Sequence, residues 1–267
     1  MPVRIVQSKQ NARLKQLRRA MAYPGRDGDD LAAIEGSNLI EEALRSGLRI
    51  DCVFAAQGAE NLLDRLRLSP QTEVLLMPRE LLTSALATEA PQPVAALIEP
   101  PDWTWAHLLD VQQKANPLIL VLAGLQDPGN LGTILRSAEA FGASGVVSMP
   151  GTVSAWNPKA VRASAGSVFR VPLLEAGAEE CFALLRAAGL KILTTAASAA
   201  EPAHCIDLTV PVALLIGNEG NGVPLEWAAQ ADGAVTIPCP GPVESLNAAV
   251  AASVLLYEAS RQRGVKR

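Results

Sequence analysis

The sequence has 267 residues, 49% of them hydrophobic and 19% charged, with a formal net charge of −4. This composition is typical of a globular protein with one or two domains, and it excludes extended disorder. The longest apolar runs, such as residues 118–125, are much shorter than the roughly 20 residues of a membrane helix. We therefore expect a cytoplasmic protein with no membrane partner and no signal peptide.

The basic residues gather at the two ends of the chain. Residues 1–26 contain seven basic residues and no acidic one, residues 261–267 contain four basic residues, and the segment between them has a net charge of −15. Lys and Arg side chains that neutralise phosphates release counterions, so this asymmetry favours a polyanionic partner for the basic ends. The alternative is a solvated helix face, but the cations at 9, 13, 15, 18 and 19 would cover more than one side of a helix.

Up to about residue 99 the pattern of apolar residues predicts a small α/β unit. Two helices come first, and short strands then alternate with helices. The predicted strands are residues 50–55, 73–77 and 94–98, and the predicted helices between them are residues 59–68 and 79–87. Prolines and a short helix at 103–114 then mark the connection to a second domain.

The second half of the sequence predicts a parallel sheet. Its nearly continuous apolar runs are typical of parallel strands that are buried on both faces. These runs are residues 118–124, 145–149, 190–195, 212–216 and 234–237. The predicted organisation is therefore a first domain at 1–99, a linker at 100–116 and a second α/β domain at 117–267.

The cysteines and histidines predict neither a metal site nor a catalytic thiol. Cys52, Cys181, Cys205 and Cys239 lie far apart in the sequence and form no C-x-x-C pair. Only two histidines are available as a base for a nucleophilic cysteine. We expect reduced and mostly buried thiols.

The first of three segments with functional character runs from 127 to 142, directly after the predicted strand at 118–124. Its first residues, DPGNLG, predict a turn, and the helix that follows has Arg136 in its first turns. Backbone N–H groups converge at such a strand-to-helix turn, so it is a candidate anion or ligand site. The turn has no Gly-Lys-Ser/Thr sequence, so we do not expect hydrolysis of a nucleoside triphosphate.

The second segment is LLIGNEGNGVP at 214–224, again directly after an apolar strand. Gly217, Gly220 and Gly222 allow the backbone to approach a ligand closely, and Glu219 places a charge at the carboxyl end of the strand. A plain turn with a solvated Glu219 is the alternative. Three glycines and two asparagines within six residues are more than one turn needs, which favours a ligand site.

The third segment runs from 237 to 263. Three prolines and Gly241 predict an extended loop, after which Ser245 is the expected N-cap of a helix and Asn247 lies in its first turn. From Ala248 to Tyr257 the helix is apolar on nearly every side, which predicts a buried or subunit-facing helix. The alternative for Ser245 is a capping role alone.

Together the three segments resemble the SpoU/TrmH branch of the SPOUT RNA methyltransferases. The matching motifs are Asn130-x-Gly132-x-x-x-Arg136 with Ala-x-x-Phe-Gly after it, Gly217-Asn218-Glu219-Gly220-x-Gly222, and Ile237-Pro238 followed by Ser245-Leu246-Asn247. The first half of the chain resembles the RNA substrate-binding domain of many of these enzymes, which has a ribosomal-protein-like α/β fold. The residues that carry this second resemblance are Ser8, Asn11, Lys15 and the sequence Ile34-Glu35-Gly36 before a helix.

The resemblance implies a fold, an assembly and an activity. The fold is an α/β SPOUT domain with a parallel sheet and a deep trefoil knot, preceded by the smaller ribosomal-protein-like α/β domain, and the assembly is a homodimer. The activity is transfer of a methyl group from S-adenosylmethionine to a ribose 2′-OH of structured RNA, with large-subunit ribosomal RNA favoured. A tRNA 2′-O-methyltransferase and a non-catalytic RNA-binding protein of the same fold are the alternatives.

The resemblance, with the basic N-terminal segment, also assigns roles to residues. The catalytic residues would be Arg136, Asn130, Glu219, Ser245 and Asn247. The cofactor-binding residues would be Thr195, Ala196, Gly217, Asn218, Glu219, Gly220, Ile237, Pro238, Ser245, Leu246 and Asn247. The RNA-binding residues would be Lys9, Asn11, Arg13, Lys15, Arg18 and Arg19, and no metal is implied.

Two other classes of protein compete with this interpretation. A nicotinamide-dependent oxidoreductase would also have glycine turns after strands, but no G-x-G-x-x-G opens a helix after an early strand. A non-catalytic protein of the same fold could have lost motif residues, and here Asn130, Arg136, Glu219, Ser245 and Asn247 are all present. The sequence therefore favours an enzyme.

Overall fold

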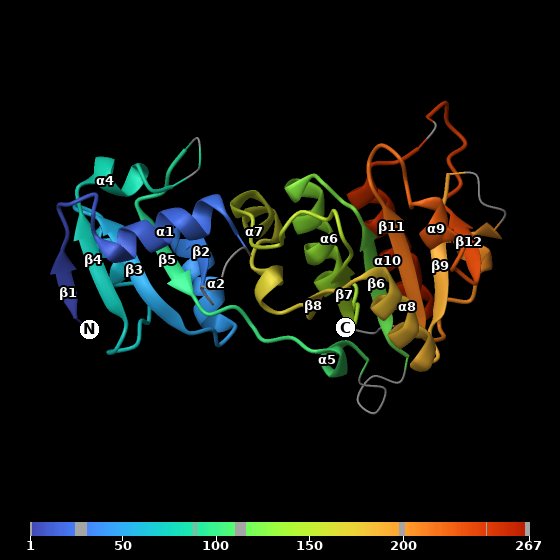
Figure 1. The fold of residues 1–267 in the computed structure, drawn as a ribbon. Helices are drawn as coiled ribbons and strands as arrows, with labels where there is room; N and C mark the ends of the chain where they lie inside the picture. The colour runs from blue at the N-terminus through green and yellow to red at the C-terminus, as the bar shows by residue number, and fades with distance from the viewer. Residues whose placement is uncertain are drawn as a thin grey trace. The chain divides into compact units, whose positions relative to one another are not determined.

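The structure is a computed structural model, and its contacts divide the chain into two compact units (Figure 1). It describes residues 2–24, 31–86, 88, 90–109, 116–197, 201–243 and 245–264. The first unit comprises the chain up to Asp102 together with Ser154–Phe169, and the second comprises Trp103–Val153 and the chain from Arg170 on. Each unit is described by itself.

The first unit contains a mixed five-stranded sheet with the strand order β1-β4-β3-β5-β2. β1, β4 and β3 are parallel to one another, whereas β5 is antiparallel to both β3 and β2. The strands are β1 (Val3–Ile5), β2 (Ala32–Glu35), β3 (Ile50–Ala56), β4 (Glu73–Met77) and β5 (Val94–Ile98).

The helices of the first unit bury apolar side chains against this sheet. On α1, Leu14, Leu17 and Met21 follow the helical repeat and pack into a core that includes Phe54 and Leu97. Complete burial of side chains of this size stabilises the fold by about 1.5–3 kcal/mol each. The helices are α1 (Ala12–Ala22), α2 (Ser37–Arg45), α3 (Glu60–Leu63), α4 (Arg79–Thr83) and α7 (Pro158–Ser164).

A buried carboxylate ties together the end of β2, the approach to β5, and α7. Glu35 is only 5% exposed, and its Oε1 accepts hydrogen bonds from the Gln92 backbone N–H at 2.6 Å and the Thr88 hydroxyl at 3.0 Å. Its Oε2 lies 3.8 Å from the Arg162 guanidinium. The Ile-Glu-Gly sequence therefore has a local structural role, because a buried carboxylate needs such partners. Gly36 follows it with φ +99°, a conformation that favours glycine.

The second unit contains a seven-stranded sheet in which every strand pair is parallel, as the apolar runs predict. β6 and β11 lie side by side near its middle and are buried at every residue. In spatial order the strands are β10 (Glu201–Pro202), β12 (Gly233–Thr236), β9 (Lys191–Thr195), β11 (Val212–Gly217), β6 (Leu118–Ala123), β7 (Gly145–Ser148) and β8 (Leu173–Glu175).

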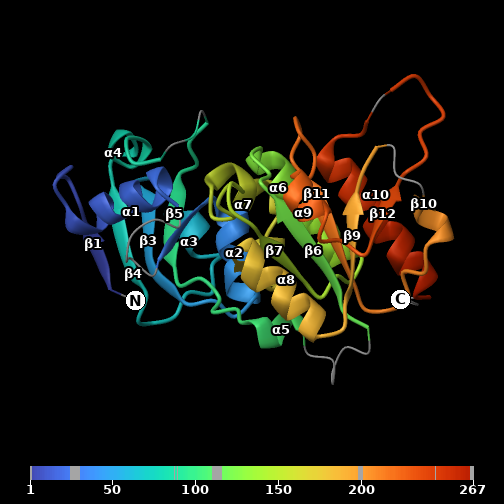
Figure 2. The same cartoon turned by 45° about the vertical axis from the view of Figure 1, so that its right-hand side comes forward.

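Helices cover both faces of this parallel sheet (Figure 2). On one face, Phe182 of α8 packs in a cluster with Val121 and Leu215. On the other, α6 and α10 contact each other, and the rings of Phe141 and Tyr257 meet edge to face with centroids 5.8 Å apart. The helices of this unit are α5 (Trp105–Leu109), α6 (Pro128–Ala140), α8 (Ala178–Ala187), α9 (Leu225–Ala228) and α10 (Ala248–Gln262).

Several predicted element boundaries are wrong. α3 and α4 are shorter than the predicted helices at 59–68 and 79–87, and the expected helix at 103–114 begins at Trp105, with residues 110–114 outside the described part of the chain. The sequence pattern also missed four strands of two to four residues, which are too short to show periodicity. The missed strands are β1, β2, β8 and β10.

Two of the four cysteine thiols are chemically protected. Burial raises the pKa of Cys52 and of Cys181 to about 12, so neither thiol forms the nucleophilic thiolate near neutral pH. Cys205 is exposed and Cys239 is half-buried, so the expectation of mostly buried thiols holds for only two of the four. Within the described residues, no helix combines the length and apolar character needed to cross a membrane.

Candidate active site

The first motif forms the start of α6 rather than a turn before it. The Asp127 side chain accepts a hydrogen bond from the Asn130 backbone N–H at 2.9 Å, and Pro128 occupies the first turn. An acidic cap followed by proline is a strong start for a helix, because proline lacks the N–H that would be unsatisfied there. Asn130 is therefore already helical, and our prediction of a glycine turn at this point is wrong.

The third motif enters α10 through Asn247 and not through Ser245. The Asn247 Oδ1 accepts hydrogen bonds from the N–H groups of Ala249 at 2.9 Å and Val250 at 3.2 Å. Asn247 is thus the N-cap, and α10 begins one residue after it. Our placement of Ser245 as the cap and of Asn247 in the first turn is wrong by two residues.

The second motif closes on itself directly after β11. Asn218 and Gly222 exchange two backbone hydrogen bonds of 3.1 Å, and the Asn218 side chain accepts from the N–H groups of Gly220 and Asn221. A Cβ at Gly217 would lie 2.1 Å from the carbonyl carbon of Gly222. Only glycine fits at position 217, because the two backbone segments touch there.

The three motifs meet in a chain of side-chain hydrogen bonds. The Asn130 Nδ2 donates to the Glu219 Oε1 at 2.7 Å, and the Asn247 Nδ2 donates to the Asn130 Oδ1 at 3.0 Å. Each residue comes from a different loop or helix start, and Asn130 bonds to both of the others. The sequence named all three as candidate site residues, and the structure brings them into contact.

These contacts set the charge of Glu219. Partial burial acts to raise its pKa, but hydrogen bonds from Asn130 and from nearby backbone N–H groups outweigh this effect and lower the pKa below its ordinary value. Glu219 is therefore a carboxylate at neutral pH and accepts hydrogen bonds. The Glu219 carboxylate is therefore suited to hold hydrogen-bond donors in fixed positions.

A pocket of about 720 Å³ opens at the carboxyl ends of β9, β11 and β12. This is the edge at which open α/β sheets bind ligands, and the volume lies within the range of small-molecule sites. All eleven candidate cofactor-binding residues line it. They are Thr195, Ala196, Gly217, Asn218, Glu219, Gly220, Ile237, Pro238, Ser245, Leu246 and Asn247.

Further residues line the pocket beyond these eleven. Ala248, Ala251 and Leu255 line it from one side of α10, and their helical spacing is the signal that could have identified them. Cys239 lines it as well, with its Sγ 3.4 Å from the Ile237 carbonyl oxygen. The remaining lining residues are Ala197, Pro202, Ile216, Gly222, Val235, Thr236 and Val243.

Arg136 is the candidate catalytic residue that the structure does not join to the others. Its side chain is exposed on α6, and within the described chain it makes no hydrogen bond or ion pair. Ser137, the next residue, is fixed instead: its hydroxyl lies 2.7 Å from the hydroxyl of Ser253 on α10. The backbone that carries Arg136 is therefore anchored while its guanidinium remains available.

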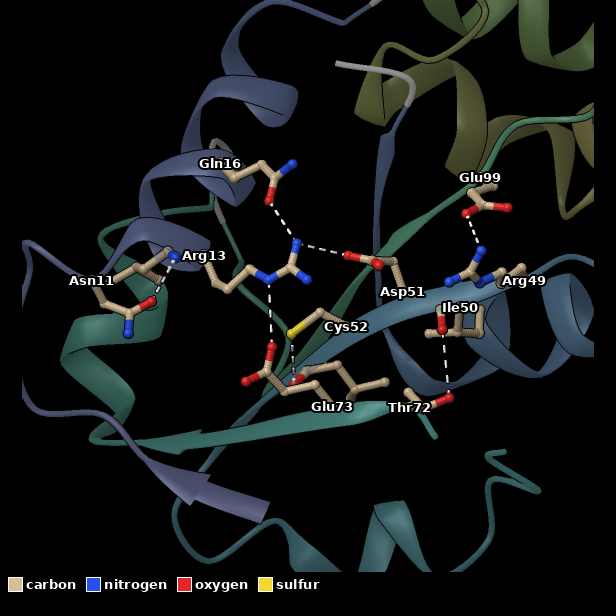
Figure 3. A network of polar contacts seen from close by, with 12 residues as sticks. Asn11, Arg13, Gln16, Arg49, Ile50, Asp51, Cys52, Thr72, Glu73 and Glu99 are labelled. Carbon is tan, nitrogen blue, oxygen red and sulfur yellow. Dashed lines mark hydrogen bonds and ion pairs between the residues drawn. The ribbon is translucent and has the colours of Figure 1, made fainter. Parts of the chain in front are cut away.

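The candidate RNA-binding residues on and before α1 separate into two groups. Asn11 caps α1 by accepting from the Leu14 N–H at 3.1 Å. The Arg13 guanidinium lies 2.8 Å from the Asp51 carboxylate and 3.4 Å from that of Glu73 (Figure 3). These two residues have contacts within the domain. Lys9, Lys15 and Arg19 are exposed, and Arg18 is half-buried with its Nε 3.5 Å from the Ser84 carbonyl oxygen.

Two family models match the chain. Residues 117–257 match the SpoU rRNA Methylase family, and residues 33–104 match the RNA 2′-O ribose methyltransferase substrate binding family. The first match covers the pocket, Asn130, Arg136 and most of α10.

Named relatives and a solved structure agree with these matches. The chain is 31% identical to the 23S rRNA (guanosine(2553)-2'-O)-methyltransferase RlmP of Bacillus subtilis, over 94% of this chain and 97% of the relative. It is 36% identical to the 23S rRNA (uridine(2479)-2'-O)-methyltransferase of Streptomyces viridochromogenes, over 72% of this chain and 68% of the relative.

The crystal structure of an AdoMet-bound rRNA methyltransferase from Sinorhizobium meliloti superposes with a TM-score of 0.83 and 31% identity, covering 97% of this chain and 98% of that one. The agreement extends through both units of the fold. The chain belongs to the SpoU family of RNA 2′-O-ribose methyltransferases.

Proposed function

We propose that the protein methylates a ribose 2′-OH in the 23S ribosomal RNA of the large subunit, with S-adenosylmethionine as the methyl donor. The single observation that carries the proposal is that Asn130 hydrogen-bonds to Glu219 and Asn247, two residues that line the pocket. Support also comes from the relatives in Bacillus and Streptomyces, whose names specify 23S rRNA and two different nucleotides. With ribosomal RNA as its substrate, the protein would act in the cytoplasm.

The pocket suits the chemistry of this donor. Its lining mixes apolar side chains such as Ile216, Leu246 and Leu255 with backbone groups of glycine-rich loops. Apolar walls accept a purine ring, and backbone N–H and C=O groups accept the polar edges of a nucleoside and an amino acid. The structural relative from Sinorhizobium meliloti is AdoMet-bound. S-adenosylmethionine supplies an activated methyl group on a sulfonium, so no metal or redox group is needed for the transfer.

The chain's own residues would position the acceptor and stabilise its developing charge. The 2′-oxygen forms a bond to the methyl carbon as the carbon–sulfur bond breaks, and the hydroxyl proton leaves to water. We assign to Arg136 the electrostatic part of this step: its guanidinium would hold the neighbouring phosphate or the developing alkoxide. A guanidinium is protonated at all physiological pH values, so it acts as a cation and not as a base.

The remaining candidate residues would orient these groups. Asn130 holds Glu219 and is itself held by Asn247, so the Glu219 carboxylate can accept a further hydrogen bond from the substrate or the cofactor. Ser245 lies in the pocket wall two residues before Asn247 and would contact the substrate or the cofactor. Proximity of this kind can supply much of the rate acceleration when the donor is already activated.

Residues 1–99 would bind the RNA and residues 117–267 would carry out the transfer, with 100–116 as the connection. The basic segment before residue 27 would supply phosphate contacts through Lys9, Lys15, Arg18 and Arg19. The structure argues for a different use of Asn11 and Arg13, whose side chains are engaged within the domain.

The finer features of the fold belong to the same proposal. We infer a deep trefoil knot in the second unit, supported by the family match and by a pocket whose lining combines residues 237–239 and 245–247 with residues that follow β9 and β11. We also infer a homodimer. Val250, Val254 and Tyr257 recur along one side of α10 and are 49%, 39% and 55% exposed, an apolar stripe suited to a second copy of the chain. We expect the wild type to sediment at twice the mass of one chain and Tyr257→Asp to sediment at the mass of a single chain.

The proposal is tested by methylation of ribosomal RNA in vitro. Deproteinised 23S rRNA is incubated with the protein and S-adenosylmethionine and then partially hydrolysed in alkali, because a 2′-O-methyl ribose protects the adjoining phosphodiester bond. One protected position in 23S rRNA is expected, and its protection should be weaker with Asn130→Ala at equal incubation times. Protection only in transfer RNA would support a tRNA enzyme instead, and no protection in either RNA would support a non-catalytic binding protein.

A further inference from the structure

α1 and its C-cap present an exposed stripe in which a tyrosine, Tyr23, has no role in the function proposed above. Lys15, Arg19 and Tyr23 are spaced by four residues, and an α-helix has about 3.6 residues per turn, so the three side chains lie on one side of α1 and its C-cap. All three are exposed, and Tyr23 is 60% exposed. The opposite side of the helix is the buried row of Leu14, Leu17 and Met21.

The exposed tyrosine needs an explanation that packing does not supply. The sequence contains only two tyrosines, and the other, Tyr257, contacts Phe141 on α6. Tyr23 ends α1 with its backbone N–H bonded to the Arg19 carbonyl oxygen at 2.8 Å, so its position relative to the helix is fixed. An exposed aromatic ring that follows a basic helix is the type of side chain on which proteins stack unpaired nucleotides.

Two cations of this segment, Arg4 and Arg13, have carboxylate partners inside the domain. Arg4 lies 3.4 Å from Glu73, and Arg13 bridges Glu73 and Asp51 while its Nη1 donates to the Gln16 side chain at 3.0 Å (Figure 3). Arg13 thereby joins α1 to β3 and β4. This brace fixes which side of α1 faces outward, and it holds Lys15 and Tyr23 on the outer side.

We propose that the stripe Lys15–Arg19–Tyr23 is a binding site for an unpaired nucleotide of the RNA substrate, with Tyr23 stacked on the base and Lys15 and Arg19 at the flanking phosphates. Arg13 is a positioning residue for this site and does not contact RNA. The inference rests on the proposed function, because it requires an RNA substrate. It adds a site outside the matched substrate-binding segment at 33–104.

Charge decides in favour of RNA as the occupant. The described residues 2–24 contain six basic side chains and no acidic one, whereas the chain as a whole is acidic. An acidic protein partner would use the cations but has no general need of a single exposed ring. An unpaired nucleotide can use both groups, because its base stacks on an aromatic ring and its phosphate binds cationic side chains.

The stacking part is tested with Tyr23→Ala and with Tyr23→Phe as its matched control, since phenylalanine keeps the ring. Affinity is measured for a single-stranded oligoribonucleotide, for a short blunt-ended RNA duplex and for deproteinised 23S rRNA. Tyr23→Ala should weaken binding of the single strand and of 23S rRNA by about ten-fold, leave the duplex unchanged, and be rescued by phenylalanine. Equal affinity of wild type and Tyr23→Ala for the single strand and 23S rRNA would overturn the proposal.

The phosphate part is tested through salt dependence. Each lost contact to a single-stranded phosphate reduces the slope of log affinity against log salt by about 0.7. Lys15→Gln should show this reduction, whereas Arg13→Gln should weaken binding with an unchanged slope and a lowered melting temperature. A slope reduced by about 0.7 in Arg13→Gln, with no reduction in Lys15→Gln, would reverse the assignment.

A cross-link provides an independent readout that does not depend on stability. Irradiation of the wild type with an oligoribonucleotide containing 5-iodouridine should attach the RNA to Tyr23, as located by mass spectrometry, and attachment exclusively elsewhere would contradict the stacked base. If the wild type binds and methylates RNA normally while these tests fail, only the inference is lost. If the wild type binds none of the RNAs, the proposed function itself fails.

Discussion

The side-chain amide of Asn247 donates to the Oδ1 of Asn130 at 3.0 Å, although 117 residues separate them in the sequence. Asn130 in turn donates to Glu219, and Asn247 at the same time caps α10. Asn247 therefore both caps α10 and holds Asn130, and Asn130 connects Asn247 to Glu219 in the loop after β11. The site depends on this pair because their hydrogen bond joins the first motif to the third, and through Asn130 to Glu219 of the second.

Replacing Asn130 with alanine should reduce kcat by about ten-fold or more with little change in folding. A hydrogen bond to a charged group contributes up to about 1.5–3 kcal/mol and less where water has access, and about 1.4 kcal/mol corresponds to a factor of ten. Asn61, exposed on α3, provides the matched control as Asn61→Ala. Single-turnover methylation of 23S rRNA measures the effect, and equal rates for Asn130→Ala and wild type would exclude a role for the link.

Arg136→Lys should turn over at least about a hundred times more slowly than wild type, in the range found for loss of a transition-state donor. Lysine keeps the charge but loses the planar fork of donors that holds a phosphate or alkoxide. Because the Arg136 side chain is exposed and makes no hydrogen bond or ion pair within the described residues, the melting temperature and cofactor affinity should not change. Near-normal turnover of Arg136→Lys would defeat the positioning role.

The lowered pKa of Glu219 predicts how the protein responds to acid. The carboxylate form is favoured in the folded state, so its contribution to stability is present above the ordinary pKa of glutamate, about 4.3, and is lost as pH falls through the lower folded-state value. The pH dependence of unfolding compares wild type with Glu219→Gln. The difference in unfolding free energy should be constant near neutral pH and shrink below about pH 4. A difference that vanishes already near pH 6 would indicate a raised pKa and contradict this assignment.

Gly217→Ala should abolish cofactor binding, because its Cβ would lie within 2.1–2.6 Å of backbone atoms of Gly222 and Val223. Backbone cannot move aside as a flexible side chain can, so the loop must open. Gly241→Ala is the matched control, since nothing lies within 4 Å of a Cβ at that position. Calorimetry should detect S-adenosylmethionine binding in Gly241→Ala and none in Gly217→Ala, and normal binding by both would show that the loop does not shape the pocket.

Secondary structure was predicted best from the sequence where a single local effect, such as burial on both faces of a strand, determines the residue pattern. Burial on both faces gives β6 and β11 continuous apolar runs, and these strands were predicted nearly to their ends. The pocket residues were predicted through the family's motifs, which lie at the ends of such strands. By contrast, β1 was missed because its three residues are exposed and it is held by pairing with β4, about 70 residues away along the chain.

Roles that depend on distant partners could not be predicted from the sequence. Asn247 and Ser245 are both good capping residues, and the choice between them depends on where the loop meets Asn130. Arg13 has the same local signature as Lys15, and only the carboxylates of Asp51 and Glu73 on other strands distinguish them. A cation in a basic segment can therefore serve the fold or a ligand, and the difference is visible only in three dimensions.

The most direct test of the whole account is calorimetric titration of the folded wild-type protein with S-adenosylmethionine, and separately with its demethylated product S-adenosylhomocysteine. The account predicts saturable heat with both ligands at one ligand per pocket, competition between them, and loss of both signals in Gly217→Ala. A well-folded wild-type protein that gives no heat with either ligand would contradict the assignment of the pocket, and with it the proposed reaction.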